Sequence, residues 1–573
     1  MSSSPPPDPI GFNPTYVPAY PPLPSLPHSS ISPSICVSAD YAHDNLKERD
    51  GLVDGKSWGE SDEQPSQLRR QLKARHIAMI SIGGVIGTGL FLGTAQSLQK
   101  GPLALLLAYC LMATLVYCMM ISLGEMISHL PVAGGHLALA TRCVDPAFGI
   151  AIGWTYTANW LLVLPTELSA AAVLVSFWSD VNPAGWISIC YVIVVIVNFG
   201  GPRVYGEVEY WAAVIKILTI IVLLIVGIVI TSGGVPNTDP IGFEFYKNPG
   251  PFNDTFLGIA PPSLASFCAF WACLTQSAYA YIGSEIVSLA AGEAKNPSRS
   301  LPRAIHRVLF RIALFYIAGV FVIGLLVSYD DRALGRADGT ALSSPFVIAI
   351  DRAGIKALPS IANAAFLSSA TSAASSGLYV SSRSLFGLAV AGQAPSVLRK
   401  TNRYGLPYVA VLVSSVFGVL AFLSAGTNGA ARVFTWLSNC CSVGGVLSWA
   451  GICFTYIRFF YGAKAQSIDR IVFPYRGRYQ PYAAIYALIG FCILLVTQGF
   501  EVFVAGNWST STFITRYLMI VLFIGAYISS RLYLGCSFVS LPAIDFFSGS
   551  RDNDESEEIE PKGFWEKLWH VLS

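Results

Sequence analysis

Long apolar segments alternate with short polar ones along most of the chain, and this alternation is the strongest pattern in the sequence. Most of the apolar segments run for roughly 18 to 28 residues, long enough to cross a hydrocarbon core of about 30 Å as a helix. They lie near residues 76–99, 102–128, 148–178, 185–200, 210–231, 264–288, 306–328, 357–385, 407–425, 433–457, 483–500 and 514–534. The pattern therefore predicts an all-α polytopic membrane protein with about twelve transmembrane helices.

The composition agrees with this class. Hydrophobic residues make up 53% of the chain and charged residues only 12%, whereas a soluble domain contains about 25% charged residues. The 12 cysteines lie mainly inside apolar segments without paired spacing in loops, which is typical of small hydrophobic residues rather than of a disulfide framework or a metal site. The sequence contains no catalytic triad, phosphate loop or His-rich cluster. We therefore expect no enzymatic activity, no cofactor, no metal and no nucleic-acid partner.

The two ends of the chain differ from the apolar region between them. Residues 1–70 are polar and proline-rich and contain no signal peptide, which predicts a disordered cytosolic tail. Residues 71–535 form the predicted transmembrane domain, and residues 536–573 a cytosolic C-terminal tail. The final "GFWEKLWHVLS" places its large apolar residues on one helical face, which indicates a short interfacial helix. Both tails are candidate docking sites for cytosolic regulators.

Lys and Arg residues gather in alternate loops and so indicate the orientation in the bilayer. Basic clusters precede the first segment and follow the sixth, eighth and tenth, with the loop after the seventh as an exception. This balance predicts a multi-pass protein with both termini in the cytoplasm, which we expect in the plasma membrane. The two glycosylation sequons outside the segments, at Asn253 and Asn507, both fall in loops assigned to the outside.

The first apolar segment is weakened near its middle by "GGVIGTGLF", residues 83–91. Gly83 and Gly87 have the spacing that lets another helix approach closely, and helix packing alone is one interpretation. The other is a discontinuous helix, whose exposed backbone N–H groups carry partial positive charge and line a cavity. On that interpretation Gly87, Thr88 and Gly89 form a cradle for a carboxylate.

A second interruption occurs in the sixth segment, where Tyr281, Gly283 and Ser284 break an apolar run. Interruptions in the first and sixth segments indicate two inverted repeats of five helices, followed by two added helices. A site of this kind suits a ligand with an anion and a cation close together. The simplest such ligand is the zwitterion of an α-amino acid.

Several stretches in order along the chain carry a resemblance to a known family. They are "HIAMISIGGVIGTGLFLG", "PTELSAAAVLVSFW", "GEVEYWAAVIKI", "GSEIVSLAAGEAKNPSRSLPRAI", "RVLFRIALFYIAG", "SSGLYVSSRSLFGLAVAGQAP" and "FPYRGRYQPYAA". Over about residues 70 to 535 the chain resembles the fungal amino-acid permeases of the amino acid–polyamine–organocation superfamily. Two positions depart from that family's pattern: His136 stands where a small residue is usual, and "SAASSGLY" replaces "SAGNSxLY".

The resemblance implies the broken-helix transporter fold with alternating access. It implies that the backbone of Gly87, Thr88 and Gly89 binds the substrate carboxylate, and that carbonyl groups around Ile82, Tyr279 and Ala280 bind the ammonium. Tyr279 matches the position of an aromatic gate, although a packed core aromatic is the alternative. The substrate-binding candidates are Ile82, Ile86, Gly87, Thr88, Gly89, Tyr279, Ala280, Tyr281 and Gly283.

Transporters of this type are generally coupled to protons, which makes ionisable residues inside apolar segments candidates for the proton path. Glu285 directly follows the second interruption and either carries the proton or holds the unwound backbone. Lys216 either extends to the interface or fills the place that a sodium ion takes in related folds. Glu167 is the third candidate, with a polar contact between helices as the alternative.

Proton-driven uptake of L-amino acids is the leading functional hypothesis. Amino-acid exchange, transport of another small zwitterion or of a polyamine, and a non-transporting amino-acid sensor are the alternatives. A polyamine has no carboxylate and needs acidic side chains in its pocket, and the first, third, sixth and eighth segments offer only Glu167 and Glu285.

Overall fold

The computed structural model describes residues 76, 79–80, 86–132, 134–179, 181–235, 239–290, 305, 312–334, 344–426 and 429–548. Three predictions fall outside these residues: the tail over 1–70, the interfacial helix near the C-terminus, and the contribution of Ile82 to the substrate site.

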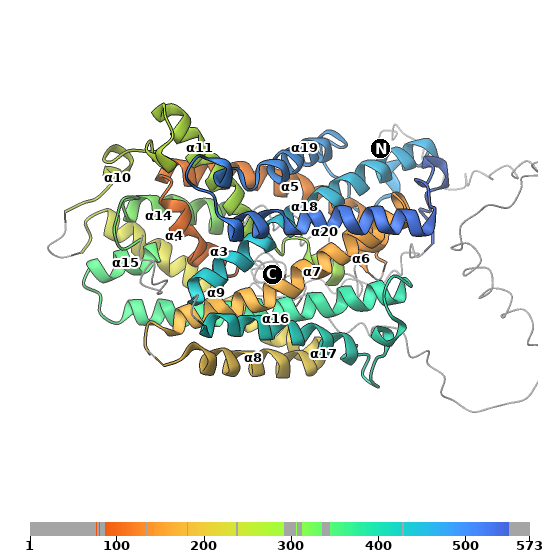
Figure 1. The fold of residues 1–573 in the computed structure, drawn as a ribbon, viewed down its shortest axis with the longest axis horizontal. Helices are drawn as coiled ribbons and strands as arrows, with labels where there is room; N and C mark the ends of the chain where they lie inside the picture. The colour runs from red at the N-terminus through yellow and green to blue at the C-terminus, as the bar shows by residue number, and fades with distance from the viewer. Residues whose placement is uncertain are drawn as a thin grey trace, which may run out of the picture. The chain divides into compact units, whose positions relative to one another are not determined.

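Helices and the turns between them account for the described part of the chain, which contains no β-strand (Figure 1). The α-helices are α3 (Thr88–Phe91), α4 (Gly93–Leu98), α5 (Pro102–His129), α6 (Gly135–Cys143), α7 (Pro146–Val175), α8 (Pro183–Phe199), α9 (Gly201–Thr231), α10 (Glu244–Lys247), α11 (Pro262–Tyr281), α12 (Ile286–Ala290), α14 (Ala318–Leu326), α15 (Pro345–Arg352), α16 (Leu358–Val390), α17 (Tyr408–Val416), α18 (Ala430–Ala465), α19 (Tyr482–Thr497) and α20 (Thr510–Leu534). The 3-10 segments are η1 (Phe256–Gly258), η5 (Ser396–Arg399), η6 (Phe417–Ala425), η7 (Arg470–Val472), η8 (Phe500–Phe503) and η9 (Leu541–Ala543), and η3 (Ile312–Ile317) is a π-helix.

Seven of the described helices are long and apolar enough to cross a membrane: α5, α7, α9, α17 with η6, α18, α19 with η8, and α20. Two further predicted segments correspond to α11 and α16, which are rich in Ser and Ala and therefore less apolar. The segment predicted over 306–328 lies only partly within the described residues. The class of multi-pass helical membrane protein is confirmed, whereas the count of twelve stays a prediction.

Helix α7 lies at the centre of the packing. It contacts α16, α18 and α20, and Figure 1 shows it in orange running between α16 and α20. In the most apolar stretches of α7 and α18, 89% of the residues are buried, against 11% in α20. Small residues bring the central helices together: a Cβ atom on Gly377 of α16 would lie 3.1 Å from the backbone nitrogen of Leu164 on α7. Because so little of α20 is buried, the face of α20 that turns away from α7 is available to lipid.

The helix boundaries follow from residues at their ends. Asp145 caps α7 by accepting a hydrogen bond of 2.6 Å from the backbone of Phe148, and Pro146 occupies the first helical position. Gly535 ends α20 with φ +57°, a left-handed conformation that glycine adopts readily. Such short-range signals explain why the predicted ends of several helices lie within a few residues of the observed ones.

One helix ends and another begins where the sequence predicted the two interruptions. Helix α11 ends at Tyr281, Ile282 follows with a non-helical backbone (φ −57°, ψ 139°), and Gly283 has φ +98° before α12 begins at Ile286. On the other side, Gly87 has extended backbone and α3 starts only at Thr88. Irregular backbone therefore occurs within both apolar segments.

Candidate functional site

A small cavity lies where these two irregular stretches face α7 and α16. Its volume is about 20 Å³, room for about one water molecule. The lining residues are Gly87, Gly89, Trp160, Val163, Glu167, Tyr279, Ala280, Ile282 and Ala373. A cavity of this size is far too small for an amino acid, so the structure represents a closed arrangement of the site.

The carboxylate of Glu167 is the charged group of the cavity wall. The hydroxyl of Thr88 donates to its Oε2 at 3.0 Å, and the hydroxyl of Tyr279 donates to its Oε1 at 2.9 Å. The backbone of Thr88 contributes a further hydrogen bond to the same carboxylate. Only 4% of Glu167 is exposed. A carboxylate of the protein therefore occupies the cradle that the sequence predicts for a carboxylate of the substrate.

Both glycines of the cradle lie in close contact with their surroundings. A Cβ atom on Gly89 would lie 2.9 Å from the Cα atom of Ala280 and 3.0 Å from the Tyr279 ring. A Cβ atom on Gly87 would lie 3.0 Å from Oε1 of Glu167. Because the obstruction at Gly89 includes backbone, it cannot be relieved by rotating a side chain. The backbones of α3 and α11 thus touch at Gly89 and Ala280, next to the two irregular stretches.

The structure brings together some of the predicted substrate-binding residues and separates others. Gly87, Gly89, Tyr279 and Ala280 line the cavity, and Thr88 lies beside them. Ile86, Tyr281 and Gly283 are not among its lining residues.

The contacts of two of these separated residues explain their positions. The carbonyl of Ile86 accepts a hydrogen bond of 3.1 Å from Ser369 on α16. The hydroxyl of Tyr281 donates to the carbonyl of Tyr109 at 2.9 Å, and its ring stacks on Tyr316. Both residues therefore join helices next to the cavity rather than forming its wall.

The predicted proton-path residues occupy three different environments. Glu167 is in the cavity wall, as described. Glu285 is fully buried, but its Oε2 accepts a hydrogen bond of 2.9 Å from the indole of Trp449 on α18, and it does not line the cavity. The ammonium of Lys216 donates to Oε1 of Glu209 at 3.3 Å, with both side chains buried. The charge of Lys216 also attracts the Glu167 carboxylate.

Glu209 is a residue that the sequence analysis missed. Its Oε2 accepts hydrogen bonds from two serines of α16, Ser372 at 2.5 Å and Ser376 at 3.4 Å. A signal was present, because Glu209 and Lys216 lie seven residues, or about two helical turns, apart on α9. Two charges of opposite sign on one face of an apolar helix are typical of a buried pair.

Four wall residues were also missed: Trp160, Val163, Ile282 and Ala373. Trp160 and Val163 share a face of α7 with Glu167, so the helical period could have identified them once Glu167 was chosen. Ile282 lies between two residues that the sequence analysis did select. Ala373 belongs to the "SAASSGLY" stretch that departs from the family pattern.

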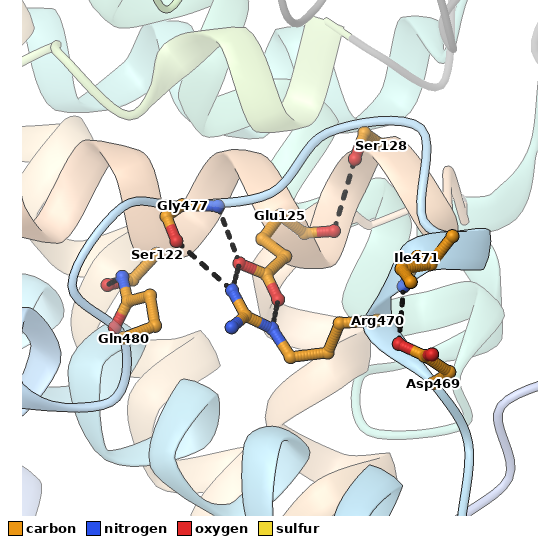
Figure 2. A network of polar contacts seen from close by, with 8 residues as sticks. All are labelled: Ser122, Glu125, Ser128, Asp469, Arg470, Ile471, Gly477 and Gln480. Carbon is orange, nitrogen blue, oxygen red and sulfur yellow. Dashed lines mark hydrogen bonds and ion pairs between the residues drawn. The ribbon is translucent and has the colours of Figure 1, made fainter.

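Another buried carboxylate, Glu125 near the end of α5, holds a loop in place (Figure 2). Arg470 donates to it from Nε at 2.6 Å and from a terminal nitrogen at 2.7 Å, and the backbone of Gly477 donates at 2.7 Å. Gln480 extends the network to the hydroxyl of Ser122 at 2.7 Å. The segment between α18 and α19 is thereby joined to α5, which is a structural role for Glu125.

The remaining candidates fall in loops. Asn253 and Asn507 are partly exposed, and the side chain of Asn253 donates to the carbonyl of Gln99 at 3.0 Å. Their glycosylation stays a prediction. Within the ranges that the structure describes, no group of three or more His, Cys, Asp or Glu side chains could hold a metal ion.

Comparison with known proteins gives one consistent result. Residues 76–542 match the family model described as amino acid permease. A lysine-specific permease of Saccharomyces cerevisiae is 39% identical over 519 residues, which cover 90% of this chain and 84% of the relative. A dicarboxylic amino acid permease of the same yeast is 38% identical, covering 87% of this chain and 82% of the relative. A proline-specific permease of Emericella nidulans is 36% identical, covering 91% and 96%.

Proposed function

Since the chain belongs to the amino acid permease family, we propose that it takes up L-amino acids across the plasma membrane together with protons. The observation that carries this proposal is the buried carboxyl of Glu167, hydrogen-bonded by Thr88 and Tyr279 inside a closed cavity. This arrangement combines a carboxyl group that can hold a proton with hydrogen-bond donors that can bind a carboxylate.

The relatives support recognition of the part that all amino acids share. Permeases named for lysine, for dicarboxylic amino acids and for proline match this chain at 36–39% identity. Their substrates differ in side chain but share a carboxylate next to an amine nitrogen. A cradle of backbone groups at Gly87, Thr88 and Gly89 would bind that carboxylate, with carbonyl groups near Tyr279 and Ala280 accepting from the ammonium.

Three interacting buried charges, those of Glu167, Glu209 and Lys216, support coupling to a proton. Glu167 and Glu209 provide two carboxylates, and Lys216 provides one ammonium, which leaves one negative charge in excess. An unbalanced charge in an apolar interior is costly, so one proton is favoured when the site is closed to water. In our proposal that proton binds Glu167 from outside, which weakens its hold on the Thr88 donors. The substrate carboxylate then takes those donors, and the proton leaves Glu167 on the cytoplasmic side.

We propose the broken-helix architecture on the same grounds. The non-helical backbone at Gly87 and at Ile282 supports discontinuous first and sixth helices. Two inverted repeats of five helices, two added helices and cytoplasmic termini complete the proposed arrangement. Glu285 has no place in the proton path of this scheme.

Uptake of labelled amino acids by cells that lack their own permeases tests the function. We expect saturable uptake that a protonophore abolishes and that sodium removal leaves unchanged. Competition by each common amino acid would then define the substrate range. An amino-acid amide, which lacks the carboxylate, should compete at least about 10-fold less well than its parent acid. Binding without any flux would indicate a sensor, and sodium-dependent uptake that resists the protonophore would rule out the coupling.

A further inference from the structure

A second polar cluster lies away from the cavity, at the ends of α4, α19 and α20. Its central member is Arg516, which is only 3% exposed although it belongs to the most exposed of the seven long apolar helices. Among the residues that the structure describes, none accepts a hydrogen bond from its Nε or from its Nη1. A buried guanidinium with two N–H-bearing nitrogens left without an acceptor is costly unless another group binds them.

Gln498, directly after α19, presents the same problem. Both its amide nitrogen and its amide oxygen are buried without a hydrogen-bond partner in the described part of the chain. Gly499, the next residue, lies against the ring of Tyr517, because a Cβ atom there would be 2.6 Å from that ring. The turn after α19 therefore packs on the start of α20, next to Arg516.

Lys100 brings a second positive charge to the cluster. It is 6% exposed and donates to the side-chain oxygen of Gln276 at 2.7 Å, so it is hydrogen-bonded but not neutralised by that neutral partner. Lys100 and Arg516 repel each other, and Glu501 attracts both. The other neighbours are the side chains of Cys273, Cys440 and Tyr517.

The charge count of this cluster leaves a positive excess. Lys100 and Arg516 contribute two positive charges and Glu501 one negative charge, so one positive charge is unbalanced. Thiols and phenols do not compensate for it at neutral pH. A membrane protein that buries an excess charge has to bind a counter-ion or pair the charge in another way.

We propose that Arg516, Gln498 and Lys100 form a binding site for one small monovalent anion, either a halide or a small carboxylate. The free nitrogens of Arg516 and the amide nitrogen of Gln498 supply the donors, and Lys100 supplies additional charge. The site lies on the side of the loops that carry Asn253 and Asn507, since the backbone of Asn253 donates to the carbonyl of Lys100 at 3.0 Å. It is distinct from the cavity around Glu167 and does not depend on the proposed transport mechanism.

Thermal unfolding of the purified full-length protein tests the site without any transport assay. The protein is measured in sodium gluconate, a bulky organic anion, with increasing replacement by sodium chloride at constant ionic strength. We expect chloride to raise Tm in a saturable way, as a ligand of the native state does. Sodium acetate in a parallel series distinguishes a site for carboxylates from one for halides.

Two variants and one control locate the effect. Arg516→Gln and Gln498→Leu should each weaken the apparent affinity for the anion, the first by at least about 10-fold, since hydrogen bonds to charged groups are strong. Arg399→Gln, which removes an exposed arginine, should retain the full response. If Arg516→Gln does not fold, Lys100→Gln is measured in its place and should likewise weaken the apparent affinity for the anion. Equal Tm values in gluconate, chloride and acetate would overturn the proposal, as would an unchanged anion response in both variants.

Discussion

The ammonium of Lys216 lies 3.3 Å from the carboxylate of Glu209 on the same helix, and neither side chain reaches solvent. Two serines of α16 donate to the other oxygen of Glu209, so the pair joins α9 to α16. A buried pair of this kind is stable only as a unit, because removing one partner leaves an uncompensated charge.

Breaking this pair from either side should therefore destabilise the protein. We expect Glu209→Gln to lower the free energy of unfolding by about 3–5 kcal/mol, which leaves the buried ammonium of Lys216 unpaired. The double variant Glu209→Gln with Lys216→Met removes both charges and should recover most of that loss. Chemical unfolding followed by tryptophan fluorescence measures both. Additive losses in the double variant would show that the two residues are not coupled.

Substitution of Gly89 should abolish uptake through a backbone clash. A Cβ atom there would lie 2.9 Å from the Cα atom of Ala280, so even Gly89→Ala should push α3 away from α11. Gly89→Val should be at least as severe, whereas Thr88→Ser keeps the hydroxyl that Glu167 accepts from and should be mild. Gly93→Ala is the matched control, because no atom lies within 4 Å of a Cβ atom at that position. Initial uptake rates are compared at equal surface expression, and equal rates for the two alanine variants would contradict the prediction.

Glu167→Gln should separate accumulation from exchange. The amide has the size of the protonated acid, so the variant should still bind substrate and exchange it, while net accumulation driven by a pH gradient falls by at least about 10-fold. Counterflow and net uptake measure the two activities. Glu285→Gln should retain accumulation, since Glu285 contacts Trp449 and not the cavity. The opposite pattern in these two variants would assign the proton to Glu285.

Loss of Arg470 should loosen the loop that it attaches to α5. The bidentate contact with Glu125 also raises the pKa of the Arg470 guanidinium. Because Arg470 is 26% exposed, we expect Arg470→Met to cost about 1.5–3 kcal/mol rather than the larger value of a fully buried pair. Arg476→Met removes an exposed arginine of the same loop and should have little effect. Proteolysis between α18 and α19 provides a second measurement, and equal rates for both variants would contradict this role.

The pair of Asp331 and Arg352 should make stability depend on acid pH. Arg352 donates to Asp331 at 2.5 Å, and this hydrogen bond is the main reason that the pKa of Asp331 is lower than its ordinary value of 3.8. A lowered pKa in the folded state stabilises the protein above the unfolded value, and the contribution is lost as pH falls through the folded value. The Tm advantage of the wild type over Asp331→Asn should therefore shrink between about pH 5 and pH 3. A difference that is constant over this range would contradict the assignment.

The apolar pattern predicted most of the helices but did not reveal which charged residues of α9 form pairs. The predicted segment 102–128 nearly coincides with α5, whose ends are set by local residues. Helix α9 begins well before the predicted start at residue 210, because Glu207 and Glu209 interrupt the apolar run. Lys216 pairs with the buried Glu209, whereas Glu207, whose side chain is 38% exposed, pairs with the buried His76.

In the candidate site, local sequence identified some of the residues, whereas others are brought there only by the packing of distant helices. The glycines that interrupt the first apolar segment identified Gly87 and Gly89 as site residues, and both line the cavity. Trp160 and Ala373 come from α7 and α16, and only the packing of those helices brings them to the same wall. Glu285 illustrates the converse, because it lies close to the interruption in sequence but faces Trp449 across another interface.

The contact between the backbones at Gly89 and Ala280 also bears on how such a protein diversifies. Main-chain atoms are the same for every amino acid, so single substitutions cannot adjust the polarity of this contact and can only obstruct it. Side chains around it, such as Trp160, Val163 and Ala373, are free of that restriction. New ligand preferences should therefore arise by remodelling those three positions while the glycines stay, and a library randomised only there is the natural starting point for engineering.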